Sequence, residues 1–168
     1  MKSKNWKMWL SVVDGRRCES CEEEHGKIYA MSETPMPKPP LHPWDRCKIV
    51  PLDAKKAGTA TRKRRDGADW WLKKHGRLPH YYITADMAES LGWKKRQGNL
   101  DEVAPGKMLA GGIYQNRNGH LPSAPGRIWY EADINYSHSH RGTERVVYSN
   151  DGLIFVTYDH YHIFEEII

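Results

Sequence analysis

The sequence has 168 residues, of which 39% are hydrophobic and 28% charged, with a formal net charge of +5. This composition suits a folded domain, alone or with an attached module, and excludes a disordered chain. No apolar run is long enough for a transmembrane helix, and the 3 cysteines cannot form a disulfide scaffold. The basic start lacks a following apolar stretch, so we expect no secretory signal and a location in the bacterial cytoplasm, or export by an unconventional route.

The positive charge is concentrated in the first part of the chain. Residues 1–67 carry 15 basic and 9 acidic side chains, whereas residues 68–168 carry 11 basic and 12 acidic ones. The run Arg62–Arg65 could contact RNA phosphates, but a solvated linker is the more common interpretation of such a run. Net charge therefore does not identify the second part as a nucleic-acid binder.

Residues 1–53 are predicted to form a small irregular module rich in cysteine, histidine and proline. Five of the ten residues from 34 to 43 are prolines, which excludes a helix there and disfavours a central strand. Residues 54–63 are small, polar and basic, which is typical of a linker. We therefore expect a basic linker at 54–63, followed by a folded domain over residues 64–168.

The module contains two pairs of metal-ligating residues. Cys18 and Cys21 are separated by two residues, and His42 and Cys47 by four. Zinc binds thiolates and imidazoles in tetrahedral geometry, so these pairs can supply one structural site. The alternative is that the cysteines are reduced thiols without a metal, and the spacing leaves both interpretations open.

Three short helices are predicted after the linker. Residues 68–75 can form a helix that ends at Gly76. Thr84 is a suitable N-cap for a second helix over residues 85–91. A third helical segment is expected at residues 100–103.

Strand patterns follow in the last part of the chain. They are expected at residues 126–136, 145–148, 153–158 and 160–167. Alternation along the first of these places three polar side chains on one face: Glu131, Asp133 and Asn135. Helices followed by antiparallel strands predict an α+β domain in which the helices pack on one face of the sheet.

Four polar residues on or near these strands could meet on one sheet face: Glu131, His160, Arg141 and Arg145. A carboxylate can take the proton of an RNA 2′-hydroxyl while an imidazolium protonates the departing 5′-oxygen. Arginines donate paired hydrogen bonds to the phosphate as negative charge develops. Each of these residues is more commonly a solvated or ion-paired side chain, so spacing alone supports catalysis only weakly.

Longer blocks carry a resemblance to a known family. The stretches LPHYYITADMAESLGW, GNLDEVAPGK, GRIWYEADINY and YSNDGLIFVTYDHYHIF resemble the microbial guanyl-preferring ribonucleases of the barnase type. The resemblance runs from Asp66 to Ile167 without a gap. It implies the microbial ribonuclease fold and cleavage of single-stranded RNA through a 2′,3′-cyclic phosphate, with no cofactor for catalysis.

The resemblance also implies roles for individual residues. Glu131 falls on the family's general base, His160 on its general acid, and Arg141 and Arg145 on its phosphate-binding arginines. Three further positions fall on substrate-binding residues of the family: Asn116, Arg117 and Tyr161. Family members are restrained by an acidic inhibitor, barstar, so the resemblance implies a toxin or effector with a barstar-like partner.

Three positions depart from the family pattern. Ala85 replaces a lysine that helps to bind phosphate, Asn118 a glutamate that contacts guanine, and Gly112 an acidic residue. Loss of the lysine predicts slower turnover unless another residue compensates. Loss of the glutamate's charge leaves the preference for guanine open.

The first part of the chain has a different resemblance. The stretches WLSVVDGRRCESCEEEHGKIY and PPLHPWDRC resemble the C-terminal tails of phage minor head proteins, which end in His-Pro-x-Cys-Arg-Cys; Asp45 stands at the first of those cysteines. The alternative function is therefore a non-enzymatic phage-head or DNA-packaging component with a degenerate nuclease domain. A third is a nucleic-acid-binding module that uses Arg62–Arg65 and a zinc site. Retention of all four catalytic candidates favours the endoribonuclease.

Overall fold

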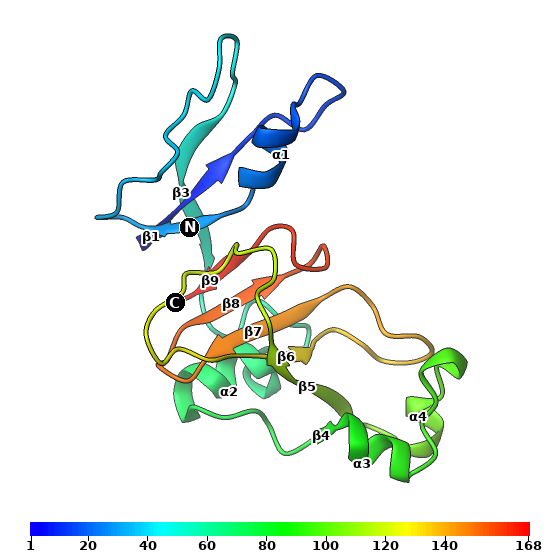
Figure 1. Cartoon of the computed structure of the whole chain (residues 1–168). Helices are drawn as coiled ribbons and strands as arrows, with labels where there is room; N and C mark the ends of the chain where they lie inside the picture. The colour runs from blue at the N-terminus through cyan, green and yellow to red at the C-terminus, as the bar shows by residue number, and fades with distance from the viewer.

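The computed structural model describes residues 1–168, which form an α+β fold around one mixed sheet of 9 strands (Figure 1). The strand order is β2-β1-β3-β9-β8-β7-β6-β5-β4. The strands are β1 Lys2–Leu10, β2 Ile28–Ala30, β3 Lys48–Lys55, β4 Tyr82–Thr84, β5 Met108–Tyr114, β6 Trp129–Asp133, β7 Arg145–Ser149, β8 Ile154–Thr157 and β9 Glu165–Ile167. The helices are α1 Glu19–Glu24, α2 Ala68–His75, α3 Ala85–Ser90 and α4 Leu100–Val103. None of these helices has the length and apolar character that a membrane crossing requires.

The three predicted helices are α2, α3 and α4. α2 ends at Gly76, whose left-handed φ of 68° suits a residue without a Cβ atom. The Thr84 side chain accepts a hydrogen bond from the Met87 amide at 3.2 Å, as expected of the N-cap of α3. Ala68 and Leu72 of α2 pack against sheet residues such as Val146, so this helix covers one face of the sheet.

The expected antiparallel strands form the middle of the sheet, but both ends of this ladder differ from the prediction. β5 to β9 are antiparallel, whereas β4 pairs with β5, and β3 with β9, in parallel. The strand predicted at 160–167 is reduced to β9. His160 and Tyr161 have φ values of 58° and 72°, which no strand residue adopts. Asn135, at φ 58°, likewise lies beyond the end of β6.

The prediction that residues 1–53 are irregular is wrong, because this part of the chain forms the strands β1, β2 and most of β3. β1 pairs antiparallel with β2 and β3, and the end of β3 pairs with β9, so these strands extend the same sheet (Figure 1). In β1, Trp6, Met8 and Leu10 occupy alternate positions and pack with Phe155 and Phe164. This alternation is present in the sequence but is obscured by the intervening lysine and tryptophan residues. The segment between β2 and β3 has no helix or strand, as its prolines predict.

The segment 54–63, predicted to be a linker, is also folded. Ala57 and Ala60 are buried and belong to the same core cluster as Leu72 of α2. The buried Asp69 carboxylate accepts hydrogen bonds from Gly58 N at 2.7 Å, Ala60 N at 3.0 Å and Thr61 Oγ1 at 3.1 Å. The small residues of this segment therefore serve close packing rather than flexibility.

Candidate active site

The predicted base, Glu131, lies in the middle of β6, opposite Val147 of β7. Its Oε2 accepts a short hydrogen bond from the Tyr161 hydroxyl. A Cβ atom at Gly111 of β5 would lie 2.9 Å from Glu131 Cγ, so only glycine leaves room for this carboxylate. Strand pairing and one hydrogen bond thus fix the position of Glu131.

His160 and Tyr161 occupy the tight turn that follows β8. The His160 amide donates to the Thr143 carbonyl at 3.2 Å, and the Tyr161 amide donates to Thr157 Oγ1 at 3.0 Å. The Tyr161 ring stacks on Tyr114 with a centroid distance of 4.9 Å. Burial, followed by the bond to Glu131, raises the pKa of Tyr161, and burial raises the pKa of Tyr114 to about 12. Both phenols therefore keep their protons at neutral pH, and Tyr161 remains a donor.

One open groove of about 400 Å³ is lined by Tyr114, Glu131, His160 and Tyr161. Its lining includes five of the seven residues that the sequence proposed for catalysis or substrate binding: Asn116, Arg117, Glu131, His160 and Tyr161. Arg141 and Arg145 are not among the lining residues. A more enclosed cavity of about 130 Å³ lies elsewhere, between Tyr82 and Ile134; it contains no carboxylate or imidazole and so offers no acid–base chemistry.

Arg141 and Arg145 are both held by Asp133, which lies two residues after Glu131 in β6. Arg141 donates to both oxygens of the Asp133 carboxylate at 2.7 Å. Arg145 forms an ion pair with Asp133 at 3.0 Å and donates to the carbonyls of Gly142 and Glu144. The Asp133 side chain is only 1% exposed. The hydrogen bonds to Asp133 raise the pKa of Arg141. Asp133 thus anchors both guanidinium groups beside the strand that carries Glu131.

The loop after β5 is closed by its own asparagines. The Asn116 side chain, in the left-handed region at φ 50°, donates to the Leu121 carbonyl at 2.8 Å and accepts from the Leu121 amide at 3.1 Å. Asn118 donates to the Tyr161 carbonyl at 3.0 Å and accepts from the His120 amide at 3.1 Å. The residue that replaces the family's glutamate therefore ties this loop to the His160 turn, a contact that the sequence did not reveal.

A second groove of about 500 Å³ adjoins the first across His160 and Tyr161. Its other wall comes from the first part of the chain and includes Arg17, His25 and Lys27. The Ile28 amide of β2 donates to the His120 carbonyl at 2.8 Å, which holds this wall against the asparagine loop. No local pattern in the sequence points to these residues, because more than ninety positions separate them from Asn118 and His120, which they meet.

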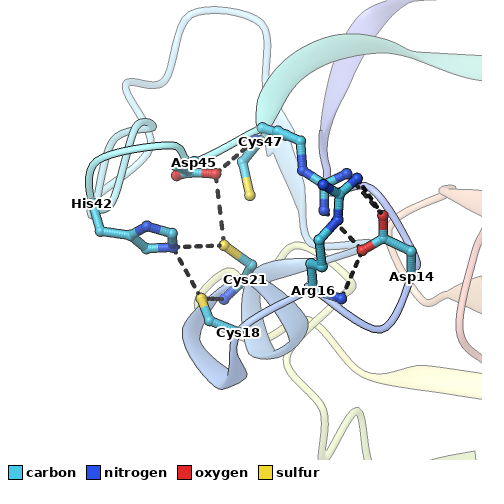
Figure 2. Close-up of polar contacts among 8 residues, drawn as sticks. Asp14, Arg16, Cys18, Cys21, His42, Asp45 and Cys47 are labelled. Carbon is cyan, nitrogen blue, oxygen red and sulfur yellow. Dashed lines mark hydrogen bonds and ion pairs between the residues drawn. The ribbon is translucent and has the colours of Figure 1, made fainter.

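The predicted metal ligands also converge, away from the groove. The ligand atoms of Cys18, Cys21 and His42 lie within 4.8 Å of one another, and so do those of Cys21, Asp45 and Cys47 (Figure 2). Cys21 belongs to both groups. The four predicted ligands therefore fall into two groups of three that share Cys21, and Asp45 belongs to the second of them.

The groove brings a carboxylate and an imidazole together, and Asp133, on the same strand as Glu131, anchors two arginines. The sequence profile of the ribonuclease family matches residues 64–168, which is more than half of the chain. The chain therefore belongs to the ribonuclease family, and the prediction of an endoribonuclease is confirmed.

Individual relatives agree with this assignment. Over 102 residues the chain is 52% identical to a ribonuclease of Heyndrickxia coagulans and to ribonucleases of Bacillus intermedius and Bacillus pumilus. The match covers 61% of this chain in each case. It spans 94% of the Heyndrickxia protein but 63% of each Bacillus protein.

The arginine anchor gives a stability prediction. Asp133→Asn leaves two largely buried guanidinium groups without their counter-charge, so we expect the free energy of unfolding to fall by about 3–5 kcal/mol. The control is Asp151→Asn, because Asp151 is 46% exposed and pairs with Arg127 at 2.9 Å; here the loss should stay below about 1 kcal/mol. Denaturant unfolding followed by tryptophan fluorescence measures both. Equal losses would show that the pair at Asp133 is not a special anchor.

Proposed function

We propose that the chain cleaves single-stranded RNA by metal-independent general acid–base transesterification. The observation that carries this proposal is the presence of Glu131 and His160 in the lining of one groove. Glu131 accepts the 2′-hydroxyl proton, the 2′-oxygen forms a bond to phosphorus, and the bond from phosphorus to the 5′-oxygen breaks. His160 donates a proton to that leaving oxygen. The product ends in a 2′,3′-cyclic phosphate, which water opens in a second step.

The remaining site residues bind and position the substrate in this proposal. Arg141 and Arg145, held by Asp133, stabilise the negative charge that develops on the phosphate oxygens. Asn116 shapes the loop that receives a base, and the exposed Arg117 extends from it. Tyr161 orients Glu131 through its hydroxyl. The guanine preference of the family is not carried over, because the Asn118 side chain is already bonded to Tyr161 and His120.

Removal of the base or the acid tests the mechanism. Glu131→Ala and His160→Ala should each lower kcat on single-stranded RNA by about 10²–10⁴-fold, because each removes one proton transfer. Cleavage by the unaltered protein should persist in EDTA and yield a 2′,3′-cyclic phosphate end, detected by mass spectrometry. The controls are Glu89→Ala and His138→Ala, both exposed and outside the groove. Full activity of both groove variants would refute the assignment.

Position 85 offers a test of whether the lysine that the family has there would strengthen phosphate binding. It occupies the first position of α3, where the family has a lysine. Ala85→Lys should raise kcat/KM about tenfold or more, because a charge-assisted hydrogen bond made in the transition state contributes ~1.5–3 kcal/mol. Met87→Lys adds the same charge at an exposed position of the same helix and should leave kcat/KM nearly unchanged. If both variants gain equally, general electrostatic attraction explains the effect instead.

We also propose that the protein is a toxin or effector restrained by a small acidic inhibitor. Uninhibited RNA cleavage would damage the cell that makes the protein, and an acidic surface complements Arg117, Arg141 and His160. Purified barstar is the available probe, and it should inhibit RNA cleavage at equimolar concentration. Inhibition should weaken in Arg117→Ala and with added salt. Undiminished cleavage in excess barstar would contradict a barstar-like partner.

A further inference from the structure

The cysteines and His42 form a cluster that the ribonuclease reaction does not use. From this cluster we propose a structural zinc site in which Cys18, Cys21, His42 and Cys47 are the four ligands (Figure 2). Asp45 is a supporting residue of the site and not a ligand. This proposal is independent of the catalytic one, because none of these five residues lines the groove that contains Glu131.

The distances suit one ion. His42 Nε2 lies 3.1 Å from Cys18 Sγ and 3.6 Å from Cys21 Sγ. In a tetrahedral zinc site, bond lengths of about 2.3 Å to sulfur and about 2.0 Å to nitrogen place neighbouring ligand atoms roughly 3.5–3.8 Å apart. Figure 2 shows the three sulfur atoms and the imidazole facing one another. The closest pair therefore needs an adjustment of only a few tenths of an ångström. Cys47 lies within 4.8 Å of Cys21 but is not in the same close group as Cys18 and His42, so its thiolate has to move toward them to complete the set.

The surroundings of the ligands support metal binding. The second ring nitrogen of His42, Nδ1, lies 2.8 Å from the Pro43 carbonyl oxygen. This contact places a proton on Nδ1 and leaves the Nε2 lone pair directed at the sulfurs, as in many metal-bound histidines. Cys18 is the N-cap of α1, and its sulfur accepts from the Cys21 amide at 3.4 Å. The cysteine pair is thus held in place by the helix itself.

Asp45 is the alternative to Cys47 as the fourth ligand. The hydrogen bonds of the Asp45 carboxylate favour Cys47. The two Asp45 oxygens accept from the backbone amides of Cys47 at 2.6 Å and Leu41 at 2.5 Å. These bonds fold the chain between His42 and Cys47 so that both can face Cys21. A set of three thiolates and one imidazole is also a common structural zinc site, closed to substrate.

A metal supplies what this segment lacks in apolar packing. Of residues 31–47, only Pro35 is buried, and Trp44 is 95% exposed. A segment with so little core is commonly stabilised by a structural metal, whose binding energy contributes to folding. The ligands also flank groove residues, since Arg17 precedes Cys18 and Glu22 follows Cys21. The ion would therefore hold the wall of the second groove beside His160.

Metal content and stability of the full chain test the site. Protein purified with a thiol reductant and without chelators should contain one zinc per chain by elemental analysis. That zinc should be lost in Cys18→Ser, Cys47→Ser and His42→Ala, and kept in Asp45→Asn and in His25→Ala, a control in the same part of the chain. A strong chelator should lower the melting temperature, and added zinc should restore it. Circular dichroism confirms that each variant is folded.

Cobalt replacement distinguishes the ligand sets. The thiolate-to-cobalt absorption should correspond to three sulfurs in the unaltered protein and in Asp45→Asn, and to two in any Cys47→Ser protein that still takes up cobalt. Zinc-free protein whose melting temperature does not respond to zinc would overturn the site. Loss of zinc in Asp45→Asn with retention in Cys47→Ser would overturn the ligand set.

Discussion

A buried carboxylate in the middle of the sheet determines where the charged groups of this enzyme lie. The Asp133 side chain is 1% exposed, and an ionised carboxylate at such depth must be neutralised by partners. Arg145 meets it from the paired position of β7, and Arg141 reaches it from the preceding loop. The loop between β6 and β7 is thereby folded back toward the strand that carries Glu131. One requirement of folding thus anchors two cations beside the strand that carries Glu131.

The first part of the chain completes the same fold. Met8, Ile28 and Leu52 pack with Val147 and other residues on the sheet face opposite α2. This face would otherwise be exposed to water, at a cost of about 25 cal/mol for each Å² of apolar surface. Figure 1 shows β1, β2, β3 and α1 at one end of the sheet, with α3 and α4 at the other. The strands that bury this face therefore also bring Arg17 and Lys27 to the groove beside His160.

The sequence predicted the features that depend on local chemistry. The ends of α2 and α4, the Thr84 cap and the central strands follow from glycine, capping residues and alternation over a few positions. The strands of residues 1–53 escaped prediction because lysines lower the hydrophobicity of β1 and its burial does not alternate regularly, since the adjacent Met8 and Trp9 are both buried. Parallel pairing of β3 with β9 joins residues more than a hundred positions apart, which no local pattern encodes.

In the candidate site, too, some features could be predicted from the sequence, whereas others depend on contacts between distant segments. Long family-like blocks identified Glu131, His160 and the arginines, and the structure places the first two in one groove. The left-handed backbone at His160 and the link from Asn118 to Tyr161 depend on contacts between distant segments, so a strand was predicted there instead. The CxxC pair marked the cysteine cluster, but the part played by Asp45 emerged only from its backbone hydrogen bonds.

The two oxygens of Glu131 have different surroundings. One oxygen is held by a hydrogen bond, and the other has free space beside it. Oε2 accepts the Tyr161 hydroxyl, whose ring is fixed by stacking on Tyr114. Oε1 lies 3.0 Å from the point that a Cβ atom of Gly111 would occupy, so the missing side chain leaves space beside this oxygen. Oε2 therefore holds the carboxylate in place, and in the proposed mechanism Oε1 is the oxygen that accepts the substrate proton. Tyr161 need not leave Glu131 for the proposed base to act, and a Cβ atom at position 111 would crowd Oε1, the oxygen that the proposal uses.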